Sequence, residues 1–285
     1  CDKFCNFCVV PFTRGPEYSR PFNEIINEAK MLVSNGAKEI TLLGQNVNAY
    51  EYENYRLSNL IYEIEKIPEI LRIRYMTSHP NDMTNDLIEI YKTSQKLMPL
   101  IHLPVQSGSD KVLNLMNRKH IVKDYLRIHE QLKKINPSIK FSSDFIVAYP
   151  GEDEKDHQNT LELIKNIKFI NSYSFIFSPR PGTTASNLEL IDRKTSLERL
   201  EVVQNELFKN QIEMNKSLEN KEINVLVENK SNKIPKLFGR SEHMTSVIFD
   251  GNEEDIGKII KVRIKDSNRN TLFGERVEKS RLRVA

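Results

Sequence analysis

The sequence predicts an α/β domain over residues 1–218, followed by a small all-β domain over residues 219–285. Three observations support this division. Short β-rich runs alternate with longer stretches of helical period, polar or Gly/Pro-containing loops follow these runs, and after residue 219 short β runs follow one another directly. Alternating strands and helices are typical of a parallel sheet with crossover helices, so we expect a parallel sheet or barrel in the first domain.

Five strands are expected in the first domain, at 38–44, 71–76, 100–105, 141–147 and 173–177. Helical periodicity is clearest at 23–36, 123–135 and 193–218. Each strand leads into a polar or Gly/Pro loop: GQNVN (44–48), TSHP (77–80), QSGS (106–109), YPGED (149–153) and SPRPGT (178–183). Because the carboxyl ends of parallel strands carry the chemistry of α/β folds, we expect these five loops to converge on one face.

The second domain is predicted to be a small β-barrel or sandwich. Its short strands are expected at 221–231, 236–241, 245–251, 257–267 and 270–277. The net charge of +3 lies entirely in this part, which has 14 Lys and Arg against 11 Asp and Glu. This excess hints at a polyanionic partner, although an ordinary solvated surface explains three charges equally well.

All three cysteines lie in the first eight residues, CDKFCNFC, with the spacing C-x3-C-x2-C. An odd, clustered set does not suit a disulfide framework, so we expect free thiolates, a metal centre and a reducing cytosol. No run of about 18 apolar residues occurs, so the sequence predicts no membrane span.

The cysteine spacing leaves two kinds of metal centre to consider. A structural zinc site would need a fourth ligand, and the first histidine of the chain is the distant His79. A [4Fe–4S] cluster held by Cys1, Cys5 and Cys8 would leave one iron open, where the amino and carboxylate groups of S-adenosylmethionine (SAM) could bind. Inert buried cysteines would not explain the spacing.

Several motifs occur in the order typical of one enzyme family: CDKFCNFCVVPFTRG, LLGQNVNAY, RIRYMTSHP, HLPVQSGSDKVLNLMNRKH, SSDFIVAYPGE and SPRPGT. With Phe7 before the last cysteine, the chain resembles the radical SAM methylthiotransferases, and its last quarter resembles their RNA-binding TRAM module. GQNVN and TSHP are similar to the MiaB type of the family, which modifies tRNA. The resemblance implies a (β/α)6-type barrel followed by a TRAM barrel.

The resemblance also implies roles for particular residues. Cys1, Cys5 and Cys8 match the ligands of the [4Fe–4S] cluster. The residues expected beside SAM are Phe7, Gln45, Asn46, Gln106, Ser143 and Asp144. In this superfamily the loop holding Gln45 and Asn46 reaches the SAM amino group, and the strand holding Ser143 and Asp144 meets the ribose. His79 either touches substrate or caps its loop.

Basic residues are expected to contact RNA phosphates, because guanidinium groups bind phosphate bidentately. In the first domain these are Arg14, Arg20 and Arg180. In the second domain they are Arg240, Lys258, Lys261, Arg263 and Lys265. Surface ion pairs or a solvated charged face remain the alternative for all of them.

The sequence departs from the family pattern at several positions. Ala148-Tyr149 stands where the family has Gly-Phe, and Thr184 replaces a proline. A glycine lets the backbone approach a ligand, so Ala148 is expected to shift SAM packing slightly. The chain starts at the cluster motif, so it looks like a fragment. The first barrel strand and the family's N-terminal domain, with its second [4Fe–4S] cluster, are expected to be missing.

The family's reaction is the methylthiolation of C2 of N6-isopentenyladenosine beside the tRNA anticodon. The resemblance therefore implies the tRNA anticodon stem-loop as partner, flavodoxin or ferredoxin as reductant, and a cytoplasmic monomer. Alternative substrates are threonylcarbamoyl-adenosine in tRNA or a ribosomal protein. Alternatives of another kind are a catalytically inactive RNA-binding fragment and a zinc-stabilised RNA-binding protein.

Overall fold

The computed structural model describes residues 1–231 and 236–277. The chain divides into two compact units, Cys1–Leu207 and Phe208–Ala285. The division falls within the long helix α8 (Arg193–Lys216), whereas the sequence placed the domain boundary just after that helix. In the described part of the chain no helix is both long and apolar enough to cross a membrane.

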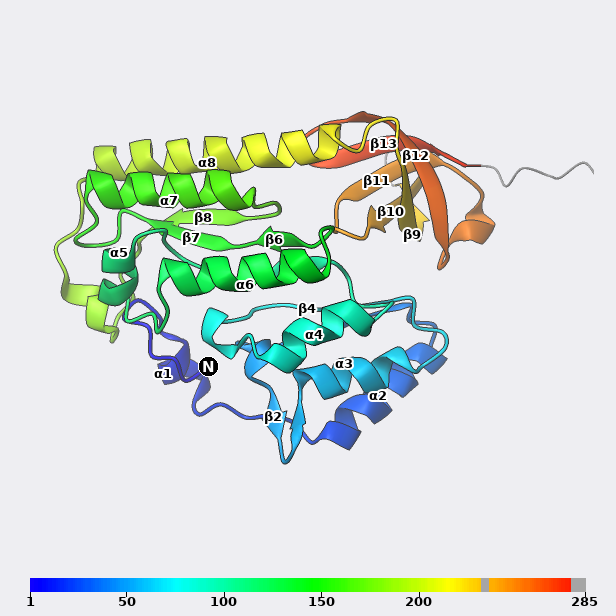
Figure 1. Ribbon diagram of the computed structural model, residues 1–285, viewed down its shortest axis with the longest axis horizontal. Helices are drawn as coiled ribbons and strands as arrows, with labels where there is room; N and C mark the ends of the chain where they lie inside the picture. The colour runs from blue at the N-terminus through cyan, green and yellow to red at the C-terminus, as the bar shows by residue number, and fades with distance from the viewer. Residues whose placement is uncertain (232–235, 278–285) are drawn as a thin grey trace, which may run out of the picture. The chain divides into compact units, whose positions relative to one another are not determined.

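The strands of the first unit form parallel pairs (Figure 1). Their bounds are β1 (Glu39–Leu42), β4 (Arg72–Tyr75), β5 (Leu100–His102), β6 (Lys140–Ser142), β7 (Asp144–Val147) and β8 (Tyr173–Ile176). β1 pairs with β4, β5 with β6, and β7 with β8. Two isolated parallel bridges, Ile73 to Leu97 and Gln106 to Phe145, add to these strand pairs within the first unit. The five predicted strands are therefore confirmed, except that the fourth is divided into β6 and β7 at Ser143.

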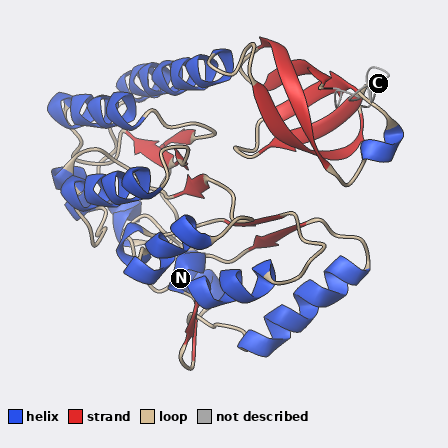
Figure 2. Ribbon diagram, turned by 45° about the vertical axis from the view of Figure 1, so that its right-hand side comes forward, coloured by secondary structure: helices blue, strands red, loops and turns tan. Residues whose placement is uncertain are grey.

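Helices lie outside this curved row of strands (Figure 2). They are α1 (Val10–Arg14), α2 (Phe22–Ser34), α3 (Leu57–Glu65), α4 (Asn85–Thr93), α5 (Asp110–Leu115), α6 (Val122–Ile135) and α7 (Glu154–Ile167), followed by α8. Alternate strand residues, such as Ile73 and Phe145, are fully buried against the helices. Successive side chains of a strand point to opposite sides, so the other face carries residues such as Thr41 and Asp144, which are less buried. The short hairpin β2 (Glu51–Tyr52) and β3 (Tyr55–Arg56) was not predicted.

The second unit contains a closed five-stranded barrel with the strand order β10-β11-β13-β12-β9. The strands are β9 (Glu222–Lys230), β10 (Leu237–Ser241), β11 (Ser246–Asp250), β12 (Ile259–Ser267) and β13 (Thr271–Arg276), so every predicted β run is confirmed. The structure decides between barrel and sandwich. β11 and β13 pair in parallel, which closes the barrel around Val247, Phe249 and Val262. A Cβ on Gly239 would lie 2.3 Å from the Leu226 carbonyl oxygen, so only glycine fits this β9–β10 contact.

Candidate functional site

Backbone hydrogen bonds connect some of the segments that follow the strands of the first unit. The backbone N–H of Val47 donates to the Thr77 carbonyl at 2.8 Å, which connects the loops after β1 and β4. The N–H of Gln106 donates to the Asp144 carbonyl at 3.1 Å, which connects the segment after β5 to β7. The start of the chain, α1 and α5 lie at the same end of this unit (Figure 1).

The cysteine loop is compact and all three of its thiols are free. Its turn is closed by the Cys8 N–H, which donates to the Cys5 carbonyl at 2.9 Å. Cys5 is buried, whereas Cys1 and Cys8 are partly exposed. Burial raises the pKa of the Cys8 thiol, and the nearby Cys5 raises it further. In residues 1–231 and 236–277, no three Cys, His, Asp or Glu side chains lie close enough to share a single metal ion.

The donor set suits an iron–sulfur cluster. Thiolate sulfur is the ligand that such clusters take, and a cluster spreads its cysteines over separate iron atoms, so the three sulfurs need not converge on one point. One of them, Cys5 Sγ, already receives an N–H group from Arg118 at 3.6 Å. Three thiols on one short loop, facing a cationic donor, therefore fit a [4Fe–4S] cluster bound by Cys1, Cys5 and Cys8.

The cysteine loop is held by segments far along the chain. The Asn6 backbone N–H donates to the Met116 carbonyl at 2.9 Å, and its Nδ2 donates to the Leu115 carbonyl at 2.8 Å. The Ala185 N–H donates to the Asn6 carbonyl at 2.9 Å. Phe7 packs against the apolar cluster of Val112, Met116, Tyr149, Phe177 and Ala185. The aromatic before the last cysteine therefore anchors the loop, and a contact with SAM stays a prediction.

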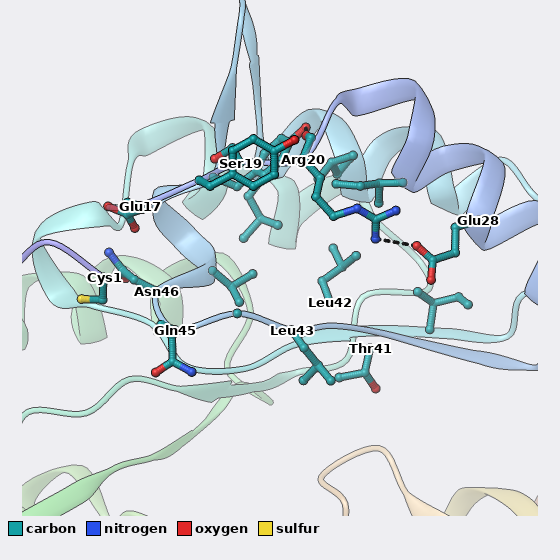
Figure 3. Close-up of a pocket in the computed structure, with 18 of the residues that line it drawn as sticks. Cys1, Glu17, Ser19, Arg20, Glu28, Thr41, Leu42, Leu43, Gln45 and Asn46 are labelled. Carbon is teal, nitrogen blue, oxygen red and sulfur yellow. Dashed lines mark hydrogen bonds and ion pairs between the residues drawn. The ribbon is translucent and has the colours of Figure 1, made fainter. Parts of the chain in front are cut away.

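Gln45 and Asn46 point to opposite sides of the end of β1 (Figure 3). Asn46 is buried and lines, with Cys1, a pocket of about 540 Å³ beside β1 and α2. Its Nδ2 donates to Asp82 at 2.7 Å, and Asp82 also binds Lys3 of the cysteine loop at 2.8 Å. The buried Asn46 Oδ1 has no partner among the described residues. Asn46 thus offers an unused acceptor next to Cys1, whereas Gln45 is exposed.

The TSHP loop is fixed by Asn48. Its Oδ1 accepts the His79 N–H and its Nδ2 donates to the His79 carbonyl, both at 2.8 Å. The His79 ring is buried, and its Nδ1 accepts the Asn81 N–H at 3.2 Å as an N-cap of the 3-10 turn η2 (Pro80–Asp82). Of the two roles considered for His79, the cap is therefore confirmed by geometry, and contact with substrate stays a prediction.

Gln106, Ser143 and Asp144 come together, but in different environments. Ser143 is fully buried, and its Oγ accepts the Val105 N–H at 3.0 Å. Its hydroxyl therefore stabilises the break between β6 and β7, and the expected contact of Ser143 with the SAM ribose stays a prediction. Asp144 is partly exposed, with Oδ2 3.7 Å from His102 Nε2. Asp144 remains the better candidate for binding a hydroxyl group.

Backbone strain collects at the same strand ends. Thr77, Gln106 and Ala148 have φ values of 69°, 75° and 54°, in the left-handed region that costs a non-glycine residue about 1–2 kcal/mol. The left-handed φ supplies a physical reason for a glycine at position 148. Here Ala148 adopts this conformation, and its N–H donates to the buried Glu152 carboxylate at 3.0 Å. Such strained residues are found preferentially where ligands bind.

The basic residues expected to bind RNA do not form one free cluster. Arg14 and Arg180 are exposed, and Arg20 is paired with Glu28 at 2.6 Å. In the barrel, Arg240 binds Glu228 at 3.2 Å and Arg263 binds Glu222 at 2.7 Å.

Lys265 is paired with Glu275 at 2.9 Å. Lys258 and Lys261 are exposed, and no carboxylate of the described residues lies within ion-pair distance of them. Of the five barrel residues predicted to bind RNA, Lys258 and Lys261 are therefore open to an external phosphate. RNA binding itself stays a prediction.

Two residues beside the cysteine loop were not predicted from the sequence. Arg118 contacts Cys5, and Asp82 joins Asn46 to Lys3. Arg118 lies 113 positions after Cys5, so no pattern of neighbouring residues in the sequence predicts this contact. The available signal was that Asp82 follows the TSHP loop after β4 and that Arg118 follows the QSGS loop and α5.

The model of the radical SAM superfamily matches residues 1–164, more than half of the chain. This chain belongs to the radical SAM superfamily. The model of the TRAM domain matches residues 216–277, which include the whole five-stranded barrel. The family implies a [4Fe–4S] cluster and SAM as cofactors.

Curated relatives match the chain along its whole length. It is 66% identical to a tRNA-2-methylthio-N(6)-dimethylallyladenosine synthase of Pelagibacter ubique (strain HTCC1062), over 100% of this chain and 65% of the relative. It is 50% identical to the protein of that name from Wolbachia pipientis subsp. Culex pipiens (strain wPip), over 96% of this chain and 64% of the relative. The chain thus spans slightly less than two thirds of these relatives.

Two solved structures share the fold of the first unit in part. Streptococcus suis SuiB bound to S-adenosylmethionine superposes with a TM-score of 0.51 and 17% identity, covering 74% of this chain and 46% of SuiB. Methylornithine synthase (PylB) gives a TM-score of 0.52 and 16% identity, covering 74% of this chain and 60% of PylB. At these identities the likeness concerns the fold alone.

Proposed function

We propose that the chain supplies the radical SAM and RNA-binding parts of a tRNA methylthiotransferase, which adds a methylthio group to C2 of N6-isopentenyladenosine beside the anticodon. The observation that carries this proposal is the loop of Cys1, Cys5 and Cys8, held at the carboxyl ends of the strands by hydrogen bonds from Asn6. The 66% identity to a synthase of that name supports the choice of substrate.

The chain's own residues would bind and orient the cofactors. The three cysteines hold the cluster, and the unpartnered Asn46 Oδ1 can accept a hydrogen bond from the SAM ammonium group. Asp144 can accept a ribose hydroxyl. When bound and reduced, these cofactors supply the radical chemistry needed to activate an aryl C–H bond, which no acid or base side chain could do at neutral pH.

The ion pair between Asp82 and Lys3 would orient the side chain of Asn46. Asp82 fixes the Asn46 amide by accepting from Nδ2, so that Oδ1 is the atom left for a ligand. Lys3 ties the same carboxylate to the cysteine loop. These contacts connect the cysteine loop to Asn46, whose Oδ1 is the proposed acceptor for SAM.

The barrel would grip the RNA rather than take part in the reaction. An anticodon loop is single-stranded, the form of RNA whose bases proteins read most readily. Lys258 and Lys261, which have no ion-pair partner among residues 1–231 and 236–277, offer their charges to its phosphates. We include three further parts in this proposal. A second [4Fe–4S] cluster outside this chain would supply the sulfur, flavodoxin or ferredoxin would be the reductant, and the enzyme would act in the cytoplasm.

The proposal is tested by anaerobic iron–sulfur reconstitution, followed by an assay for 5′-deoxyadenosine formed from SAM under reduction. We expect about four irons per chain and 5′-deoxyadenosine in the wild-type protein, and neither in Cys5→Ala. Thr13→Ala, an exposed change in the same segment, is the control and should behave as wild type. Bound zinc, or a cluster without SAM cleavage, would refute the catalytic proposal.

Substrate choice requires a separate test. Anticodon stem-loop RNA with N6-isopentenyladenosine should bind more tightly than RNA with threonylcarbamoyl-adenosine, because the prenyl group adds apolar area. Equal binding of both RNAs would remove the support for this substrate. RNA binding with an intact cluster but no cleavage of SAM would favour a catalytically inactive RNA-binding protein.

A further inference from the structure

The guanidinium of Arg118 is fixed beside the cysteine loop. Its Nη2 donates to the Pro104 carbonyl at 2.6 Å, and its Nη1 lies 3.6 Å from Cys5 Sγ. Next to it, Asn117 Nδ2 donates to the Phe4 carbonyl at 2.8 Å, so the same turn also holds the loop backbone. Anchoring by the Pro104 carbonyl leaves the guanidinium little freedom to turn away from the sulfur.

This cation has no acidic partner. No Asp or Glu of the described residues lies within ion-pair distance of Arg118, and its buried Nε has no hydrogen-bond partner there. The neighbouring side chains do not compensate the charge. His79 and His120 are buried, with ring centroids 5.6 Å apart.

Both imidazoles are held in the neutral form. Burial, and then the positive charge of Arg118, lower the pKa of His79 to about 2 and that of His120 to about 3. A partly buried guanidinium beside two neutral imidazoles favours an anion that approaches it. Its nearest sulfur is Cys5, which carries negative charge when it binds iron as a thiolate.

We propose that Arg118 is a positioning residue that raises the reduction potential of the cluster bound by Cys1, Cys5 and Cys8. This inference rests on the proposed function, because it requires the cluster. Reduction adds negative charge to the cluster, so a cationic N–H donor at a ligand sulfur stabilises the reduced form more than the oxidised form. Hydrogen bonds to the sulfurs and nearby charge are among the factors that set cluster potentials.

Arginine is suited to this task in a way that lysine is not. The planar guanidinium binds the Pro104 carbonyl with one nitrogen and faces Cys5 with the other. A lysine ammonium at the same position keeps the charge but lacks the rigid fork, so it cannot hold both contacts in one geometry. The two variants Arg118→Met and Arg118→Lys therefore separate charge from geometry.

The test is a redox titration of the reconstituted 285-residue chain, followed by electron paramagnetic resonance without SAM. Iron per chain is measured first, so that only loaded samples are compared. For Arg118→Met we expect the ratio of reduced to oxidised cluster at a fixed potential to fall at least tenfold, a 59 mV lowering of the midpoint. Arg118→Lys should fall between this variant and wild type.

Lys119→Met is the matched control, since it removes an adjacent positive charge that is exposed and bonded to Asn117 rather than to Cys5. Its midpoint should equal that of wild type. A fully loaded Arg118→Met protein with the wild-type midpoint would overturn the inference, even if its thermal stability fell. If that midpoint is unchanged while SAM binding weakens in calorimetry, the guanidinium serves the SAM carboxylate instead, and the inference fails.

Two further outcomes are separable. If Arg118→Met takes up no cluster, Arg118→Lys decides, because a lowered midpoint supports the inference and a wild-type midpoint overturns it. If the wild-type chain itself takes up no cluster, the proposed function fails, and this inference fails with it. A loaded wild-type protein with unaffected variants refutes the role of Arg118 alone.

Discussion

Replacing Glu152 by glutamine should remove a loss of stability that the wild-type protein suffers between pH 5 and pH 8. Glu152 is buried in the loop after β7. Its Oε1 lies 2.9 Å from Arg199 Nη1 and accepts the Ala148 N–H at 3.0 Å. Glutamine keeps an oxygen for both donors, so the substitution removes the titration and retains the hydrogen bonds.

The sign and size of the effect follow from the pKa of this carboxyl. Burial raises the pKa of Glu152 from 4.5 to about 7, although Arg199 lowers it. The folded protein therefore holds a proton that the unfolded chain releases above pH 4.5. This contribution to stability is complete below pH 4.5 and is lost as the pH rises through 7. Linkage gives a loss of about 2–3 kcal/mol between pH 5 and pH 8.

Urea unfolding of both proteins at pH 5 and pH 8 measures this difference. The free energy of unfolding of E152Q, relative to wild type, should rise by about 2–3 kcal/mol across that interval. E154Q is the control, because Glu154 is exposed and lies 3.9 Å from Arg199 Nη2. Parallel pH profiles for wild type and E152Q would refute the reasoning.

Three further changes test other parts of the structure. Asn48→Ala should lower the free energy of unfolding by about 1–3 kcal/mol, measured by urea unfolding, because it leaves the buried N–H of His79 unpaired and removes one of the two hydrogen bonds to the His79 carbonyl. Gly108→Ala should cost about 1–3 kcal/mol in the same assay, since its Cβ would lie 2.6 Å from the Asn159 carbonyl oxygen. Lys258→Ala should weaken binding of anticodon stem-loop RNA and reduce the slope of log K against log salt by about one, measured by fluorescence anisotropy.

Each of these changes has a control. Asn59→Ala removes an exposed cap on the Arg56 N–H, and it should cost less than Asn48→Ala. Gly44→Ala would meet only a Val47 methyl at 3.2 Å, so a cost equal to that of Gly108→Ala would contradict the packing argument. Lys194→Ala removes an exposed charge from α8, and equal loss of RNA affinity would argue against a specific contact at Lys258.

Local patterns were enough to place the elements. Helical period located α2, and β-rich runs located the strands of both units. The sequence motif also brought Cys1, Cys5 and Cys8 to one loop, because their spacing is short and needs no tertiary contact. The local pattern did not predict the break between β6 and β7 at Ser143. It lies within one continuous β-rich run, yet the chain breaks there, and its hydroxyl turns to the Val105 backbone.

What the sequence by itself determined is therefore the order and kind of the elements, the cysteine set and the loops that follow the strands. Tertiary structure alone decided that β11 pairs in parallel with β13, that Asn46 rather than Gln45 is buried and bonded to Asp82, and that Arg118 reaches Cys5. Secondary structure depends on neighbours along the chain, whose periodicity can be read directly. Contacts such as the one between Arg118 and Cys5 join residues 113 positions apart, and they exist only after the strands have assembled.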